Sequence, residues 1–497
     1  MTRVQVLCAM RMEALAVRLG APRVAIKVSG IGPAKASSLG RRLASELPQD
    51  LPCCVVGLAG GLLSRLRPGT MVVASELKRK GREPIRLPGA EIVAGAIRRL
   101  GLEAEVGPVI SVDHIVHGEE RDQLAAEGAV AVDMESAWFA EALAPRPLLV
   151  IRSISDTVGT GVFGVARGVA LGLGSLRRGA PVGLEWARAW RPREIILASP
   201  RSFCAGVERA IEVVERAIER YGAPVYVRRQ IVHNHHVVSR LEQMGAIFVE
   251  ELDQVPDGAV VVFSAHGVSP KVREEATRRQ LQTIDATCPL VAKVHLETRR
   301  FASRGYQVIL IGHAGHDEVE GTLGEAPGAI LVSRPEDVEA LDLPRDTQVA
   351  YTNQTTLAPE DVAQVVDAIR RRFPSARGPA ADDICYATHN RQEALRAILP
   401  QCDTVIVASS PNSSNGNRLA EIAARGGVRV ALVDDASQLD LGWLAGASKI
   451  GITAAASTPE WIVEEVLEAL SGLGPIQVRE TSSGFENVRF PLPQEVR

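Results

Sequence analysis

The stretch Ser199-Pro-Arg-Ser-Phe-Cys-Ala-Gly-Val-Glu-Arg-Ala-Ile211 decides how the second half of the chain is interpreted. It follows a short β-branched run and leads into a segment whose apolar periodicity predicts a helix to about residue 221. Cys204 is therefore expected where a strand gives way to a helix. Aligned backbone N–H groups at a helix start stabilise negative charge, so this position favours a thiolate over a thiol.

Two further cysteines have the same local setting. Cys288 is followed by Pro289, which suits the first position of a helix, and Cys385 precedes a predicted helix over residues 391–399. Three such thiolates could converge on one metal centre. The alternative for any lone cysteine is a small buried hydrophobe, and this is the interpretation for the other four, Cys8, Cys53, Cys54 and Cys402.

Composition excludes several classes of protein. A chain of 497 residues is too long to fold around one ordinary hydrophobic core, so two or more domains are predicted. A net charge of −3 does not indicate the positively charged surface that nucleic-acid-binding proteins carry. No signal peptide or membrane span is apparent in the sequence. Seven cysteines without an export signal favour reduced thiols or metal ligands over disulfides. We therefore expect a cytoplasmic protein.

Two series of alternating strand and helix patterns run along the chain and predict an α/β fold. The first covers residues 1–180 and the second residues 194–480. Residues 181–193 are predicted to connect them, and residues 481–497 to form a C-terminal tail. Because the three cysteines divide the second series, we predict three similar α/β modules around a shared centre.

Polar residues gather just after the predicted strands of the second series, at the edge where parallel sheets bind ligands. His233, His266 and His316 lie there beside Gly or Ser. Their position suits anion binding, although each could also be an ordinary hydrogen-bonded imidazole. Uncharged donors that could hold a diphosphate are Ser413, Ser414, Asn415 and Ser457. The alternative for the Ser-Ser-Asn run is a helix N-cap.

Short sequence motifs follow one another through the second series, from about residue 194 to residue 475. They are Phe203-Cys-Ala-Gly-Val207, Val232-His-Asn234, Ser264-Ala-His-Gly267, Ala286-Thr-Cys-Pro289, Gly312-His-Ala-Gly-His316, Gln354-Thr-Thr356, Asp383-Ile-Cys-Tyr386, Asn390-Arg-Gln-Glu393, Asn412-Ser-Ser-Asn415 and Thr453-Ala-Ala-Ala-Ser457. Together they resemble the 4-hydroxy-3-methylbut-2-enyl diphosphate reductase (IspH/LytB) family of isoprenoid biosynthesis. Two positions depart from the family pattern: Ser202 replaces a usual glycine, and Asp317 stands where proline is common.

The resemblance implies a cofactor and a reaction. Cys204, Cys288 and Cys385 would hold a [4Fe–4S] cluster with one iron free of a protein ligand and open to the substrate's hydroxyl oxygen. The allylic diphosphate would be reduced to isopentenyl and dimethylallyl diphosphate. Because no flavin or nicotinamide motif is apparent, a ferredoxin or flavodoxin is the implied electron donor.

The resemblance also assigns roles around the cluster. Glu318 would donate the proton, since burial near an apolar chain raises the pKa of a carboxyl as an acid requires. Its alternative is a solvated loop carboxylate. Thr355 and His316 would steer the hydroxyl and the proton. The residues implied to bind substrate are His233, His266, His316, Thr355, Ser413, Ser414, Asn415 and Ser457.

The first half carries a second set of motifs: Ala9-Met-Arg-Met-Glu13, Val28-Ser-Gly-Ile-Gly-Pro33, Gly57-Leu-Ala-Gly-Gly61, Val132-Asp-Met-Glu-Ser136 and Arg152-Ser-Ile-Ser-Asp156. They resemble the purine nucleoside phosphorylase and methylthioadenosine nucleosidase superfamily, including nucleosidase-like proteins tied to hopanoid synthesis. The resemblance implies a purine nucleoside site. Glu135, beside Met134, would bind ribose hydroxyls, Glu13 would orient a water, and Asp156 would protonate the purine.

Other functions compete with these predictions. Quinolinate-synthase-like enzymes also use three scattered cysteines on a three-module α/β fold. A non-enzymatic alternative is an iron- or redox-sensing module, which would leave Glu318 and the diphosphate donors without a task. For the first half, the alternative to nucleoside chemistry is a non-catalytic scaffold.

Overall fold

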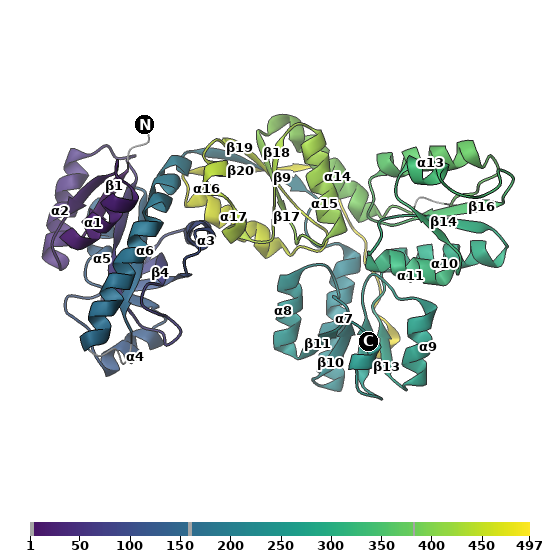
Figure 1. Cartoon of the computed structure of the whole chain (residues 1–497), viewed down its shortest axis with the longest axis horizontal. Helices are drawn as coiled ribbons and strands as arrows, with labels where there is room; N and C mark the ends of the chain where they lie inside the picture. Colours follow the sequence, from purple (N-terminus) through teal and green to yellow (C-terminus); the bar gives the residue numbers. More distant parts are fainter. Residues whose placement is uncertain (1–3, 158–161, 381–382) are drawn as a thin grey trace. The chain divides into compact units, whose positions relative to one another are not determined.

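The computed structural model describes residues 4–157, 162–380 and 383–497 (Figure 1). The chain forms two compact units. The first unit comprises Met1–Ile195 with the later segments Asp435–Lys449 and Glu464–Val478. The second comprises Ile196–Asp434, Ile450–Val463 and Arg479–Arg497. The units therefore separate near the predicted boundary at residue 194, and they interleave in sequence after Asp434.

The first unit is built on one eight-stranded sheet in the order β2-β1-β3-β7-β6-β4-β5, with β8 paired to β3 and β4. Its strands are β1 (Gln5–Cys8), β2 (Ala25–Val28), β3 (Cys53–Gly61), β4 (Met71–Lys78), β5 (Ile85–Arg86), β6 (Ala104–Ser111), β7 (Ala131–Asp133) and β8 (Leu148–Asp156). Its helices are α1 (Arg11–Gly20), α2 (Pro33–Glu46), α3 (Ala90–Arg99), α4 (Glu119–Ala126), α5 (Ser136–Leu143), α6 (Val162–Ala189) and α16 (Leu441–Leu444).

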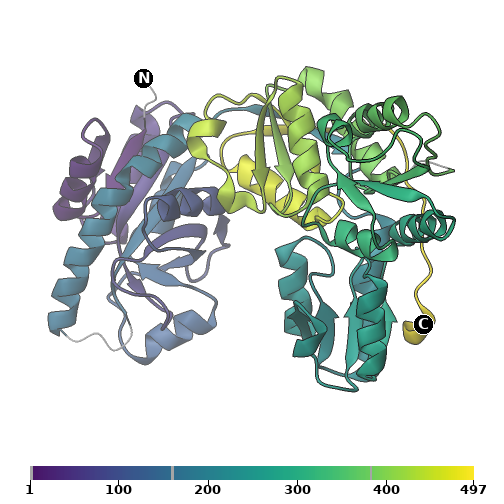
Figure 2. The ribbon, with the colours of Figure 1, turned by 45° about the vertical axis from the view of Figure 1, so that its right-hand side comes forward.

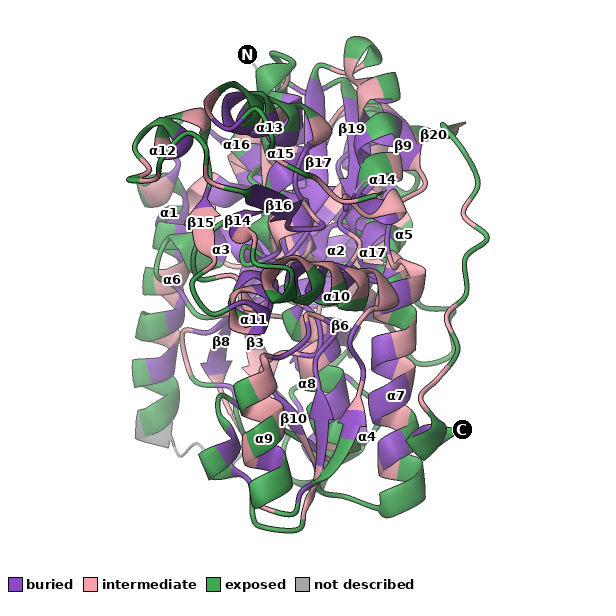
Figure 3. Ribbon diagram, turned by 90° about the vertical axis from the view of Figure 1, so that its right-hand side faces the viewer, coloured by how far each residue is buried: buried purple, intermediate pink, exposed green. Residues whose placement is uncertain are grey.

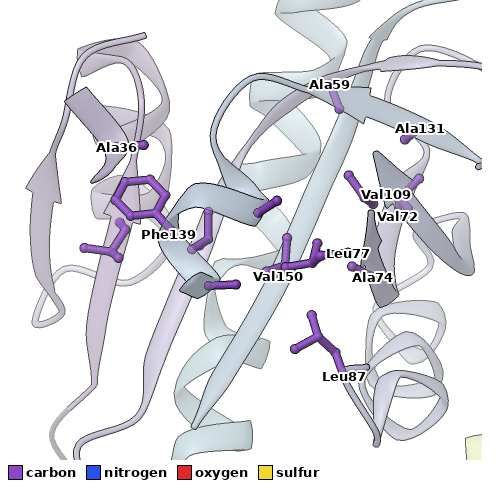
Figure 4. Close-up of a cluster of buried hydrophobic side chains, with 14 of the residues drawn as sticks. Ala36, Ala59, Val72, Ala74, Leu77, Leu87, Val109, Ala131, Phe139 and Val150 are labelled. Atoms are coloured by element: carbon purple, nitrogen blue, oxygen red, sulfur yellow. The ribbon is translucent and has the colours of Figure 1, made fainter. Parts of the chain in front are cut away.

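The core of this unit lies between the sheet and its helices. The central strand β3 is buried at most positions, as an apolar run covered on both faces should be. Figure 4 shows part of the core, with Phe139 of α5 near Ala36 of α2 and Val150 of β8 between them and Val72 of β4. Burying side chains of this size drives the assembly of the sheet and its cover.

The segment predicted to connect the domains, 181–193, is mostly helical. The helix α6 continues through Pro181 to Ala189, and β9 (Arg193–Ser199) follows almost at once. The end of α6 and the start of β9 are hydrogen-bonded to a later segment of the same unit. Trp186 Nε1 donates to Gly472 O at 3.2 Å, and Arg193 Nη1 donates to Leu473 O at 2.7 Å. The first unit is therefore completed by residues far along the chain.

The second unit contains three sheets, which confirms the predicted three α/β modules. Their orders are β11-β10-β12-β13, β15-β14-β16 and β18-β17-β19-β9-β20. The strands are β10 (Val225–Arg228), β11 (Ala246–Val249), β12 (Val260–Phe263), β13 (Gln282–Asp285), β14 (Gln307–Ile311), β15 (Ile330–Val332), β16 (Val349–Asn353), β17 (Thr404–Ala408), β18 (Arg429–Val433), β19 (Lys449–Ala454) and β20 (Ile476–Ser482).

Helices cover these sheets, and the turned view of Figure 2 separates the modules. The helices are α7 (Ala205–Tyr221), α8 (His235–Met244), α9 (Pro270–Arg278), α10 (Pro289–Ser303), α11 (Asp317–Glu325), α12 (Pro335–Glu339), α13 (Pro359–Arg372), α14 (Tyr386–Ile398) and α15 (Ser414–Arg425). The helix α17 (Glu460–Ser471) begins in the second unit, and from Glu464 on it belongs to the first. Short 3₁₀ turns occupy Leu252–Gln254, Leu399–Gln401, Ala436–Gln438 and Gln494–Val496. Among the residues described, no helix is both long and apolar enough to cross a membrane.

The predicted C-terminal tail packs against the second unit. After β20 it runs as an extended segment (Figure 3). Val496 is buried in the core of the first module, and Tyr221 Oη of α7 donates to Glu495 O at 3.0 Å. Glu486 pairs with the fully buried Arg391 of α14 at 2.9 Å. The tail thus joins α7 to α14, the helices that follow Cys204 and Cys385.

Candidate active site

Each of the three cysteines is the N-cap residue of a helix. Cys204 precedes α7, Cys288 precedes α10 and Cys385 precedes α14, so the predicted helix-start setting is confirmed. All three line one cavity of about 110 Å³. A Cβ added to Gly206 would lie 2.8 Å from Cys288 Sγ and 3.8 Å from Cys204 Sγ, which puts both sulfurs at the first turn of α7.

The electrostatics of the thiols differ from the sequence expectation. Burial raises the pKa of Cys288 to about 11, and backbone N–H groups of α10 offset only part of this increase. Burial likewise raises the pKa of Cys385 to about 12, with a further increase from the neighbouring Cys204. The expectation that a helix start favours the thiolate is therefore wrong for these two cysteines, because desolvation outweighs the helix-end field.

The spacing of the sulfurs indicates what the three cysteines could bind. A single tetrahedral zinc with Zn–S bonds of about 2.3 Å would bring its sulfurs to within about 4 Å of one another. In the described parts of the chain, the groups whose ligand atoms all lie within 4.8 Å of one another contain histidine and aspartate and not the three cysteines. Sulfurs held farther apart around one cavity fit a multi-iron cluster better than a single ion.

Glu318 lies at the start of α11, on the wall of the same cavity. Its carboxylate accepts hydrogen bonds from Thr355 N at 2.7 Å and from Thr355 Oγ1 at 3.0 Å. Its side chain is buried, which excludes a solvated loop carboxylate. Burial raises the pKa of Glu318 to about 7, and the nearby carboxyl of Asp383 adds to the increase while the Thr355 hydrogen bonds oppose it. The carboxyl of Glu318 therefore titrates near neutral pH.

The three predicted histidines form a cluster at strand ends. The rings of His233 and His266 stack with centroids 4.1 Å apart, and His316 meets them edge-on at 5.3 and 5.7 Å. Burial lowers the pKa of all three, that of His316 to about 4. Neutral imidazoles keep one N–H donor each, so the cluster can donate hydrogen bonds to an oxyanion.

Hydroxyl and amide groups complete the cavity wall. Ser413 Oγ lies 3.3 Å from Ser457 Oγ, and Asn415 Oδ1 accepts a hydrogen bond from Ala456 N at 3.0 Å. Ser413 also caps α15, so the N-cap alternative and the cavity position hold together. Ser414 Oγ lies 2.9 Å from the hydroxyl of Thr356, which also lines the cavity. Thr356 was missed as a site residue, although it ends the Gln-Thr-Thr motif.

The structure also brings together the predicted nucleoside residues of the first unit. Glu13, Met134, Glu135 and Asp156 line one cavity of about 280 Å³. Glu13 accepts hydrogen bonds from Leu58 N at 2.7 Å and Met10 N at 2.8 Å. Glu135 accepts from Gly32 N at 2.9 Å. Burial raises the pKa of both glutamates, and nearby Arg152 opposes the increase.

Two arginines contact the carboxylates of this region: Arg121, which has no sequence signal, and Arg152, which opens the motif ending at Asp156. Arg121 lines the same cavity and donates to Asp156, whose other carboxylate oxygen accepts from Ser155 Oγ at 2.7 Å. Arg152 is buried and pairs with Asp133, while its Nη2 lies 3.7 Å from Glu135. A guanidinium beside Asp156 stabilises the charged carboxylate. In this structure both carboxylate oxygens of Asp156 therefore accept hydrogen bonds.

Comparison with known proteins finds matches for both halves of the chain. Residues 195–471 match the family model described as LytB protein. The chain belongs to the LytB family. A 4-hydroxy-3-methylbut-2-enyl diphosphate reductase of Methylococcus capsulatus is 54% identical to the LytB region over 308 residues, 61% of this chain and 98% of that relative. The corresponding reductase 2 of Mycobacterium bovis is 56% identical over 308 residues, 61% of this chain and 94% of its own length.

A solved structure agrees with this membership. The E-1-hydroxy-2-methyl-but-2-enyl-4-diphosphate reductase of Plasmodium falciparum matches the LytB region with a TM-score of 0.59 and 39% identity, covering 62% of this chain and 97% of that one. Residues 9–164 match the Phosphorylase superfamily model, as predicted for the first half. The LytB membership favours the reductase over the quinolinate-synthase-like alternative.

Proposed function

We propose that the LytB region of this chain reduces (E)-4-hydroxy-3-methylbut-2-enyl diphosphate to isopentenyl and dimethylallyl diphosphate. The reaction takes up two electrons and two protons, breaks the allylic C–O bond and releases one water. One observation carries the proposal: three N-cap cysteines, a buried glutamate and three histidines line one cavity. The names of the similar enzymes support the substrate.

Cys204, Cys288 and Cys385 would hold a [4Fe–4S] cluster, with one iron left without a protein ligand. When bound, the cluster supplies single electrons and a Lewis-acidic iron. A ferredoxin or flavodoxin would deliver the electrons, and a reducing cytoplasm would keep the three thiols free. The raised pKa values of Cys288 and Cys385 fit this role, because a metal centre stabilises thiolates that burial alone disfavours.

The remaining side chains bind the substrate and handle the proton. Glu318 holds a proton at its buried carboxyl, and Thr355 Oγ1, 3.0 Å away, connects that carboxyl to the substrate's hydroxyl. The diphosphate would lie against uncharged imidazole, hydroxyl and amide groups, which donate hydrogen bonds to phosphate oxygens without forming an ion pair. These donors are His233, His266, His316, Ser413, Ser414, Asn415 and Ser457.

The test is anaerobic purification, electron paramagnetic resonance after reduction, and turnover with an artificial electron donor. We expect a reducible iron–sulfur signal and formation of both diphosphates. Cys204→Ala should lose both, whereas Cys402→Ala, which changes a cysteine outside the cavity, should keep both. A protein that binds zinc and no iron, or a clustered protein inert toward the allylic diphosphate, would refute the proposal.

A second proposal concerns the first unit. Its cavity would bind a purine nucleoside, with Glu135 holding the ribose hydroxyls and Glu13 orienting a water. The support is the convergence of Glu13, Met134, Glu135 and Asp156 on one cavity, together with the Phosphorylase superfamily match. An adenosine with an apolar 5′ substituent of the hopanoid kind is the substrate to test first, because the motifs resemble hopanoid-associated nucleosidases.

The full chain and its Glu13→Gln variant distinguish catalysis from a scaffold role. We expect adenine release from 5′-substituted adenosines by the full chain and loss of at least a hundredfold in rate in the variant, the magnitude typical of removing an acid–base group. Absence of both base release and purine binding would reduce the first unit to a scaffold.

A further inference from the structure

A half-buried arginine, Arg229, links the first module of the LytB region to the second. Arg229 directly follows β10 and has a backbone φ of 57°, which is unusual for a residue with a side chain. Its guanidinium reaches α11, where Nη1 donates to Asp317 and, at 2.7 Å, to Glu320 Oε2. These hydrogen bonds raise the pKa of Arg229 further than its burial lowers it.

Asp317 faces the histidine cluster with its other oxygen. Its Oδ2 lies 3.9 Å from His266 Nδ1, while Oδ1 is held by Arg229. As the first residue of α11 it stands between His316 and Glu318, and its side chain is 16% exposed. A poorly screened carboxylate in this position opposes any anion that approaches the histidines.

We propose that Arg229 is a positioning residue that neutralises Asp317 and thereby keeps the histidine cluster able to accept the substrate's diphosphate. This inference rests on the proposed function. Arg229 also ties α11 to the first module. Replacing Arg229 alone leaves the negative charge of Asp317 facing the substrate's diphosphate. Replacing Arg229 and Asp317 together removes that negative charge as well.

The experiment compares Arg229→Gln, Asp317→Asn and the double variant in the full, cluster-loaded chain. We measure kcat and KM for the allylic diphosphate, and inhibition by inorganic diphosphate. Arg229→Gln should raise KM and the inhibition constant about tenfold or more, because an uncompensated charge is left near the anion, with a smaller change in kcat. The double variant should recover most of the lost affinity, and Asp317→Asn alone should bind at least as tightly as the parent.

The control is Arg240→Gln, which removes an exposed arginine whose partner is Glu215 in the same module, at 2.7 Å. It should leave KM unchanged. Two results would overturn the inference: an Arg229→Gln variant with parental affinity, or a double variant as impaired as Arg229→Gln. The second would indicate a purely structural contact, and thermal unfolding of each variant would show it. If the parent neither turns over the substrate nor binds diphosphate, the proposed function itself fails.

Discussion

At the scale of single residues, burial of Glu318 gives the proposed proton donor a raised pKa. Its raised pKa of about 7 keeps the carboxyl protonated below neutral pH, and Thr355 holds it in place. We expect kcat/KM to fall as pH rises through about 7, because the donor then loses its proton. Glu318→Gln should lower the rate by roughly 10²–10⁴-fold. The measurement is kcat/KM against pH for the parent and the variant.

A surface variant, Glu336→Gln, is the matched control and should keep the parental profile. The same group affects stability: because the folded-state pKa exceeds the ordinary value of 4.5, the folded state gains a proton, and its stability falls as pH rises from 4.5 to 7. Glu318→Gln should flatten that decline. An unchanged pH profile in Glu318→Gln would exclude this residue as the donor.

Gly206 provides a test of the cysteine cluster that leaves all ligands in place. A Cβ at this position would meet Cys288 Sγ at 2.8 Å, closer than real Cβ atoms approach. We expect Gly206→Ala to displace the sulfur and to reduce the iron content per chain well below that of the parent. Gly484→Ala, where a Cβ meets no atom within 4 Å, is the control. Full iron occupancy in Gly206→Ala would contradict the placement of Cys288.

The residues found from sequence alone share one property, which is a local signal. Cys204, Cys288 and Cys385 are recognisable because each lies beside a helix start. Arg229, and Arg121 in the first unit, carry no such signal, because their partners Asp317 and Asp156 are distant in sequence and meet them only in the folded state. Local chemistry was therefore predictable, whereas charge compensation between elements was not.

Ser202 illustrates a departure that the structure explains. Its φ of 60° lies in the left-handed region, where glycine is at ease and other residues lose about 1 kcal/mol. Its hydroxyl donates to Glu460 Oε2 at 2.5 Å, and its carbonyl accepts from Arg391 Nη2 at 2.7 Å. These hydrogen bonds offset the cost of replacing the family's usual glycine.

At the scale of elements, α14 anchors the Cys204 segment through a single side chain. Arg391 is fully buried and donates to Ser202 O, Phe203 O and Glu486. Arg391→Leu should destabilise the second unit by about 3 kcal/mol or more, since it removes a buried guanidinium and leaves the carbonyls of Ser202 and Phe203 without their donor. Thermal unfolding measures the loss, and iron content should fall with it.

The control lies on the same helix. Arg396 is partly exposed and pairs with Glu360 at 2.6 Å and Glu393 at 2.8 Å. Arg396→Leu should change the stability by no more than about 1 kcal/mol, as is usual for surface ion pairs. Equal losses in the two variants would show that burial of Arg391 does not matter.

Element boundaries were less predictable than element types. The sequence around Pro181 suggested a connection because proline, glycine and tryptophan interrupt the apolar pattern, yet α6 continues to Ala189. Proline ends most helices because it removes a hydrogen bond and crowds the preceding turn. Contacts made elsewhere in the first unit, such as the one from Trp186 to Gly472, contribute to keeping the helix intact. Tertiary packing thus overrode a local rule.

At the scale of the whole molecule, the two sites lie in different compact units. We therefore expect their chemistries to be separable in the full chain. Cys204→Ala should abolish reductase turnover and leave purine nucleoside binding and adenine release intact, while Glu13→Gln should slow adenine release and leave reductase turnover intact. Both activities are assayed on the same preparations. Loss of nucleoside binding in Cys204→Ala would instead show that the first unit depends on an intact cluster.

The interleaved boundary has a consequence for synthesis of the chain. The first unit needs Asp435–Lys449 and Glu464–Val478, which leave the ribosome roughly 240 residues after Ile195. At about 5–20 residues per second that delay is on the order of 10–50 s. During it, Trp186 and the end of α6 lack their later partners, so the nascent first half stays incompletely covered until those segments of the chain have been made. In a protein truncated after Ile195, Trp186 and the end of α6 would never gain these partners.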